Sequence, residues 1–193
     1  MIIPTLEDIR HIFQADRGKN ESQHITIEGF QRAGVLVPII QTAKGPQLLM
    51  TKRTEQVETH KGQISFPGGM NDSVDKDIVD TALREAHEEV GIPNSSIEAI
   101  GLLDDLPTPT GFVITPVVGI IEDLPPLIPS RNEVAKILQV PLEFFLDAKN
   151  ARTELREWRG KHHEIWFYHF GENVIWGATA NITRTLLKKL RLI

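Results

Sequence analysis

The chain has 193 residues and no cysteine, and its 26 acidic and 21 basic side chains give a formal net charge of −5. This composition is typical of a globular protein with one sizeable core, and it excludes disulfides and cysteine-ligated metal sites. Net acidity argues against a nucleic-acid-binding surface, and apolar runs such as 35–40 are too short to span a membrane. Because the amino terminus also lacks the layout of a signal peptide, a cytoplasmic protein is expected.

The amino-terminal part of the chain predicts a helix followed by a hairpin. A short amphipathic helix is expected over 5–14, and the polar stretch 15–30 is expected to be a loop. The β-rich run 33–41 and the run 47–53 flank a turn and pair naturally as two strands. Pro38 lies inside the first run, which suggests an edge strand or a bulge.

The middle of the chain contains the clearest helix. A short extended segment at 63–66 is stopped by a Pro-Gly-Gly sequence. A helix is then expected over 77–90, because Asp77 is a good N-cap and Gly91 a good glycine stop.

The remaining elements are shorter and complete a mixed pattern. We expect strands at 97–103, 115–121, 165–170 and 174–176, a loop at 107–111, a short helix or turn at 132–140, and a closing helix at 178–190. This mixture predicts one α+β or α/β domain over 31–193, with residues 1–30 appended as a helix and loop.

The negative charge is concentrated in one segment. Between residues 71 and 91 there are seven acidic and two basic side chains, so this segment alone accounts for the net charge of the whole chain. Such a run is either a solvated helix face or a site for cations.

The positions of the acids on the helix favour the cation site. At 100° per residue, one arc is apolar and faces the core, and it comprises Val79, Ala82, Leu83, Ala86 and Val90. Glu85, Glu88 and Glu89 fall on the adjoining arc, where like charges one turn apart repel and the helix dipole disfavours anions. A hard divalent cation such as Mg²⁺ or Mn²⁺ would remove both penalties. Arg84 is expected to steady Glu88 without occupying this patch.

The same helix carries a recognisable motif. After a Gly-Gly pair at 68–69, residues 84–92 have the sequence REAHEEVGI, which resembles the box R-E-U-x-E-E-x-G-U of the Nudix hydrolase superfamily, where U is a bulky aliphatic residue. Asp75 stands where this box usually has a glutamate. The resemblance implies a Nudix-type α/β/α sandwich around a mixed β-sheet, and a metal-dependent enzyme that hydrolyses a diphosphate attached to a nucleoside.

A second resemblance covers most of the chain. The segments 48–53 (LLMTKR), 59–69 (THKGQISFPGG) and 109–119 (PTGFVITPVVG) are similar to signatures of the coenzyme A pyrophosphatase branch of this superfamily, and so is the ending 175–180 (IWGATA). The branch implies hydrolysis of coenzyme A or acyl-coenzyme A to 4′-phosphopantetheine and adenosine 3′,5′-bisphosphate.

These resemblances assign candidate roles to particular residues. The expected metal ligands are Glu85, Glu88 and Glu89, which would bind Mg²⁺ or Mn²⁺, and the catalytic set adds Glu133 as an outside candidate for the general base, alongside Glu88 and Glu89. The expected substrate contacts are Arg53, His60, Lys61, Gly68, Gly69 and Phe112, with Arg53 and Lys61 on phosphates and Phe112 stacked on adenine. The partner is a small-molecule nucleotide, bound by a monomer or homodimer.

Two other functions fit the same motif. One is a broader hydrolase of nucleoside diphosphate compounds, acting on ADP-ribose, nucleotide sugars or nucleoside triphosphates. The other is a non-catalytic nucleotide sensor on the same fold.

Overall fold

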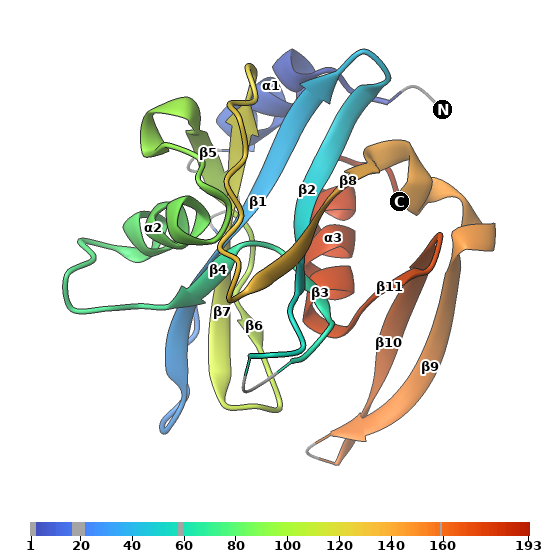
Figure 1. The fold of residues 1–193 in the computed structure, drawn as a ribbon. Helices are drawn as coiled ribbons and strands as arrows, with labels where there is room; N and C mark the ends of the chain where they lie inside the picture. Colours follow the sequence, from blue (N-terminus) through green and yellow to red (C-terminus); the bar gives the residue numbers. More distant parts are fainter. Residues whose placement is uncertain (1–2, 17–21, 58–59, 159) are drawn as a thin grey trace.

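The computed structural model describes residues 3–16, 22–57, 60–158 and 160–193 (Figure 1). Thr59 and part of the expected loop 15–30 lie outside these residues. The helices are α1 (Leu6–Asp16), α2 (Ile78–Val90) and α3 (Gly177–Lys189). The larger sheet contains β1 (Gln31–Thr42), β2 (Gly45–Arg53), β3 (Ile64–Ser65), β4 (Gly68–Met70), β5 (Glu98–Leu102), β6 (Leu106–Pro107), β7 (Phe112–Ile121) and β8 (Val134–Pro141). The smaller sheet contains β9 (Ala151–Trp158), β10 (Lys161–Phe170) and β11 (Asn173–Trp176).

The larger sheet is mixed. Its central order is β3-β2-β1-β7-β5, with β4 paired to β1, β6 to β7 and β8 to β2. Strands β1 and β7 run parallel over the whole register from Gln31 opposite Phe112 to Ile40 opposite Ile121, and the other pairs are antiparallel. The expected hairpin at 33–41 and 47–53 is confirmed, since Ile39 lies opposite Leu48.

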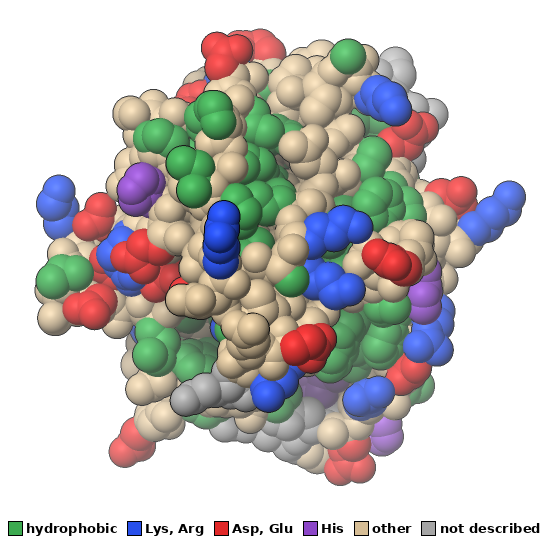
Figure 2. All heavy atoms as spheres, in the orientation of Figure 1, with side chains coloured by type: hydrophobic (Ala, Val, Ile, Leu, Met, Phe, Trp, Pro, Cys, Tyr) green, Lys and Arg blue, Asp and Glu red, His purple; other side chains and the backbone are tan. Residues whose placement is uncertain are grey.

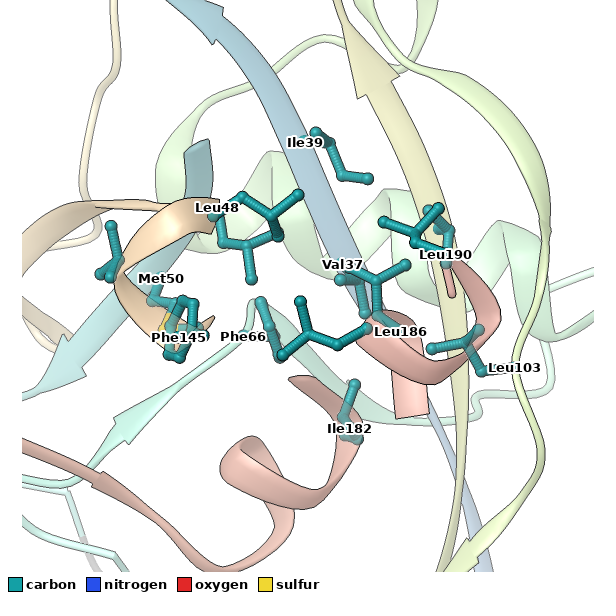
Figure 3. Packing of buried hydrophobic residues seen from close by; sticks show 14 of the residues in the cluster. Val37, Ile39, Leu48, Met50, Phe66, Leu103, Phe145, Ile182, Leu186 and Leu190 are labelled. Atoms are coloured by element: carbon teal, nitrogen blue, oxygen red, sulfur yellow. The ribbon is translucent and has the colours of Figure 1, made fainter. Parts of the chain in front are cut away.

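Alternation along the strands builds a core on each face of this sheet. On one face Val37 and Ile39 of β1 share a cluster with Ile182 and Leu186 of α3 (Figure 3). Apolar residues of α1 belong to the same cluster. On the other face Leu36 and Ile40 pack against α2. The result is an α/β/α sandwich in which α1 shares the core of the main sheet, and the small sheet lies beside α3 (Figure 1). No helix in the described part of the chain is long and apolar enough to cross a membrane.

Pro38 does not mark an edge strand, because β1 lies between β7 and the strands β2 and β4. The ladder on the latter side changes partner at this point: β1 pairs with β4 up to Val35 and with β2 from Ile39. The Leu36 N–H, which points to that side, donates to the Pro67 carbonyl. The N–H that Pro38 lacks therefore falls in a gap of the ladder and costs no pairing.

Two elements in the second half of the chain differ from the expectations. In the segment 132–140 only residues 132 and 133 form a turn, and from Val134 the chain is strand β8 and not a helix. A register shift between Lys52 and Arg53 leaves one extra residue in β8, so the regular alternation of faces is broken between Lys136 and Val134. Strand β9 was not expected, because its charged sequence, ARTELREW, lacks an apolar face; it is held by pairing with β10.

Candidate functional site

Helix α2 is fixed at both ends and lies close to the sheet. The Asp77 carboxylate accepts two hydrogen bonds of 2.9 Å from backbone N–H groups of the first turn, and Gly91 ends the helix with a left-handed φ of 74°. Gly34 of β1 allows the close approach, because a Cβ atom there would lie 2.7 Å from the Ile78 carbonyl oxygen. The expected helix is thereby confirmed, and Figure 2 shows acidic and basic side chains gathered over it and over the preceding loop.

Glu89 is the buried member of the glutamate set, with 3% of its surface exposed. Its Oε2 lies 3.5 Å from the Thr51 hydroxyl, and its Oε1 lies 4.0 Å from Nη1 of Arg53. The Gly68 backbone N–H also donates to this carboxylate. Burial raises the pKa of Glu89 to about 7, because the opposing attraction of Arg53 is weaker and two neighbouring carboxylates raise the pKa further.

Glu85 lies against the glycine pair that opens the motif. A Cβ atom on Gly69 would lie 2.5 Å from the carboxyl carbon of Glu85, so a larger residue there would force the Glu85 carboxylate to move. Nη1 of Arg84 donates to Glu85 at 2.8 Å and to Glu88 at 3.3 Å. The expectation that Arg84 stays outside the glutamate patch is therefore wrong. Burial raises the pKa of Glu85 in spite of this ion pair, whereas the Glu88 side chain is 56% exposed.

Arg84 is anchored from its other side by Asp75. Its Nε and Nη2 donate to the two carboxylate oxygens of Asp75 at 2.8 and 3.0 Å, and Nη2 also donates to the Met70 carbonyl. The Thr81 hydroxyl completes the shell around Asp75. The Arg84 guanidinium holds the pKa of Asp75 well below its usual range. The residue that replaces the usual glutamate of the box thus ties the loop before α2 to the helix.

Glu133 approaches the glutamates from the segment before β8. It is exposed, and its carboxylate lies close enough to raise the pKa of both Glu85 and Glu89. Its backbone carbonyl accepts a 2.8 Å hydrogen bond from the Thr54 N–H. The fold therefore brings together carboxylates that are more than forty residues apart in the sequence.

Of the expected substrate contacts, Arg53 and the two glycines border the glutamates. Arg53 ends β2, and its Nε is buried with no hydrogen-bond partner. His60 and Lys61 are exposed and belong to the turn before β3. That turn is tied to Arg53 through Gln63, whose carbonyl accepts from the Arg53 N–H and whose side chain contacts His60 Nδ1 at 3.0 Å.

Phe112 lies apart from the glutamates. It starts β7 opposite Gln31, whereas Gly69 lies opposite Gly34 across the other edge of β1. Three residues along a strand span about 10 Å, and two strand spacings add to that separation. The structure therefore does not bring Phe112 into contact with the reaction centre.

The donor set fits a hard divalent cation. In the described part of the chain, no three Asp, Glu or His side chains already surround one point as metal ligands would. Even so, Glu89 is a buried carboxylate whose nearest cation is 4.0 Å away, and its neighbours Glu85 and Glu133 repel it. Carboxylate oxygens of this kind suit Mg²⁺ or Mn²⁺.

Two residues of the site were not predicted. Thr51 is 1% exposed and faces Glu89, and Thr54 binds the segment that carries Glu133. The alternation of β2 was a usable signal for Thr51, because residues 51 and 53 share one face of the strand. Nothing in the sequence indicated the Thr54 contacts, because its partners lie in the distant turn before β8.

Comparison with known proteins shows the family of this chain. The family model of the NUDIX domain matches residues 30–167 of the chain. The chain belongs to the Nudix family. It is 40% identical over 161 residues to the uncharacterized Nudix hydrolase NudL of Photorhabdus laumondii, a match that covers 83% of this chain and 86% of that protein. It is 38% identical over 182 residues to NudL of Enterobacter sp. strain 638, with coverage of 94% and 93%.

Solved Nudix structures share the fold. The MutT/nudix family protein of Enterococcus faecalis superposes with a TM-score of 0.53 at 14% identity, covering 99% of this chain and 76% of that one. RenU of M. smegmatis has a TM-score of 0.51 at 20% identity, with coverage of 65% and 81%. The expected Nudix-type sandwich is thereby confirmed. The chain is a Nudix hydrolase that acts on pyrophosphate bonds, in a family that generally uses divalent metal ions and binds small nucleotides.

Proposed function

We propose that this Nudix hydrolase cleaves the diphosphate bond of coenzyme A or acyl-coenzyme A, releasing 4′-phosphopantetheine and adenosine 3′,5′-bisphosphate. The supporting observation is that two segments similar to the coenzyme A branch border the glutamates. The segment that ends in the Gly-Gly pair donates from Gly68 to Glu89 and packs Gly69 against Glu85. The other segment ends in Arg53, 4.0 Å from Glu89. A cytoplasmic monomer or homodimer belongs to the same proposal.

Glu85, Glu88 and Glu89 are the proposed holders of Mg²⁺ or Mn²⁺. When bound, such an ion neutralises charge on a diphosphate and lowers the pKa of a coordinated water molecule. Because the net negative charge of the chain resides in the segment that contains these glutamates, ion binding offsets it at the position where an anionic substrate must approach.

The chain's own residues then orient the substrate and move the proton. The Arg53 side chain is partly exposed and its Nη1 lies 4.0 Å from Glu89, which supports a contact of the guanidinium with a phosphate oxygen. Glu133 is exposed to water and its charge raises the pKa of both Glu85 and Glu89, which supports it as the group that accepts the proton of an attacking water molecule. Asp75 anchors Arg84 from the loop before α2, and the same guanidinium pairs with Glu85 and Glu88.

A substrate panel tests this proposal. Purified protein is incubated with coenzyme A and either Mg²⁺ or Mn²⁺, and the products are separated by liquid chromatography. Release of adenosine 3′,5′-bisphosphate is expected, and the Glu89→Gln variant is the control for contaminating activity. Rapid cleavage of ADP-ribose or nucleoside triphosphates with no cleavage of coenzyme A would assign the broader hydrolase function instead. Nucleotide binding without any turnover would indicate a sensor.

A further inference from the structure

The segment that leads to Glu133 is fastened to the carboxyl end of α2. The Ser130 N–H donates to the backbone carbonyl of Glu89 at 2.9 Å. The Ser130 carbonyl in turn accepts from the N–H groups of Glu133 and Val134, at 3.1 and 2.8 Å. One short turn therefore connects the backbone of the buried glutamate to the backbone of Glu133.

Thr54 holds the same turn from the opposite side. Its N–H donates to the Glu133 carbonyl and its hydroxyl donates to the Asn132 carbonyl, both at 2.8 Å. The hydroxyl also accepts from the Gln56 N–H at 3.3 Å. A single residue thus connects the chain after β2 to the two residues that precede β8, through its N–H to Glu133 and through its hydroxyl to Asn132.

The location of this connection coincides with the end of regular pairing between β2 and β8. The register shifts between Lys52 and Arg53, so that Val134 lies opposite Arg53 and the ladder stops there. Among the described residues, no donor forms a hydrogen bond with the Glu133 carboxylate itself. Its direction is consequently set through its backbone, and the Thr54 hydroxyl supplies the only side-chain hydrogen bond to that backbone segment within the described part of the chain.

We infer that Thr54 is a positioning residue: it holds Glu133 toward Glu85 and Glu89 for the hydrolytic reaction. The inference rests on the proposed function in one respect, namely that Glu133 takes part in hydrolysis. A Thr→Val change keeps the shape of the side chain and removes only the hydroxyl. Loss of one such hydrogen bond corresponds to roughly a 3- to 10-fold change in rate.

Three single variants separate positioning from general stability. Thr54→Val should lower kcat for coenzyme A with Mn²⁺ about 3- to 10-fold, with KM changed less than about twofold, whereas Thr54→Ser should restore kcat because it keeps the hydroxyl. Thr185→Val is the matched control, since it removes a comparable hydroxyl bond, 3.1 Å to the Asn181 carbonyl on α3. Thermal unfolding shows whether each variant is folded.

A double-mutant cycle decides whether Thr54 acts through Glu133. In the Glu133→Gln background, Thr54→Val should cause no further loss of kcat, because the group that it positions is gone. A full additional loss in that background would overturn the inference, as would unchanged activity of Glu133→Gln alone. If the wild type cleaves ADP-ribose and not coenzyme A, only the substrate proposal fails, and the same coupling is expected with ADP-ribose. Absence of turnover with both compounds would refute both.

Discussion

Replacing Glu89 by glutamine should raise stability while it abolishes activity. Glu89 is 3% exposed, and burial raises its pKa from the ordinary value of 4.5 to about 7. Between these two pH values the folded protein binds more protons than the unfolded chain, so stability falls as the pH rises through this window. Because each tenfold change in proton affinity corresponds to about 1.4 kcal/mol, an ionised Glu89 costs the metal-free fold roughly 3 kcal/mol at pH 8.

Glutamine has nearly the same shape and carries no charge. The metal-free Glu89→Gln variant should therefore unfold several degrees above the metal-free wild type at pH 8, since about 1 kcal/mol shifts Tm by roughly 2–4 °C for a chain of this size. The difference should vanish near pH 4, where Glu89 is protonated in both states. Added Mn²⁺ should raise the Tm of the wild type more than that of the variant, because a ligand stabilises the state that binds it.

Thermal unfolding at pH 4, 6 and 8, with and without Mn²⁺, measures these effects, and turnover of coenzyme A is measured on the same samples. Turnover by Glu89→Gln should fall by orders of magnitude. Glu88→Gln is the matched control: its side chain is 56% exposed, so no comparable pH-dependent gain is expected. The reasoning is refuted if Glu89→Gln is less stable than the wild type at pH 8, or if its gain in Tm is as large at pH 4.

Three further changes test other parts of the site. Gly69→Ala should displace the Glu85 carboxylate, whose carbon would otherwise lie 2.5 Å from the new Cβ. The variant should have a kcat/KM at least tenfold lower and a weaker response to added Mn²⁺ in a metal titration. An unchanged titration would contradict this contact. Asp75→Asn should lower Tm at pH 7, because it breaks the paired bonds to Arg84. Since the pKa of Asp75 is depressed in the folded protein, the difference in Tm between wild type and variant should shrink as the pH falls below about 4. An equal difference at pH 3 would argue against the ion pair. The buried Asp105 carboxylate binds the Ile25 N–H and the His24 side chain. Asp105→Asn should therefore loosen residues 22–25, and their backbone amides should exchange hydrogen faster. Unchanged protection of these amides would contradict that role.

The site could be predicted from the sequence where its residues lie on one element. Glu85, Glu88 and Glu89 share a helical arc because 3.6 residues per turn determine that arc, and the caps at Asp77 and Gly91 are local features. The failures occur where another element decides. Strand β8 is fixed by its pairing with β2, and a bulge in that pairing breaks the regular alternation that would mark a strand in the sequence. Likewise, Arg84 contacts Glu85 because Asp75 anchors it from the neighbouring loop.

The sequence by itself determined the family, the helix and the concentration of charge between residues 71 and 91, because each depends on residues close together in the chain. Only the tertiary structure decided how the glutamates differ. Glu89 is buried between α2 and β2 and has a raised pKa, Glu88 remains largely in solvent, and Glu133 joins them from a distant segment. These differences arise from desolvation and from charges brought close by folding, and both depend on distances through space that the order of residues does not encode locally.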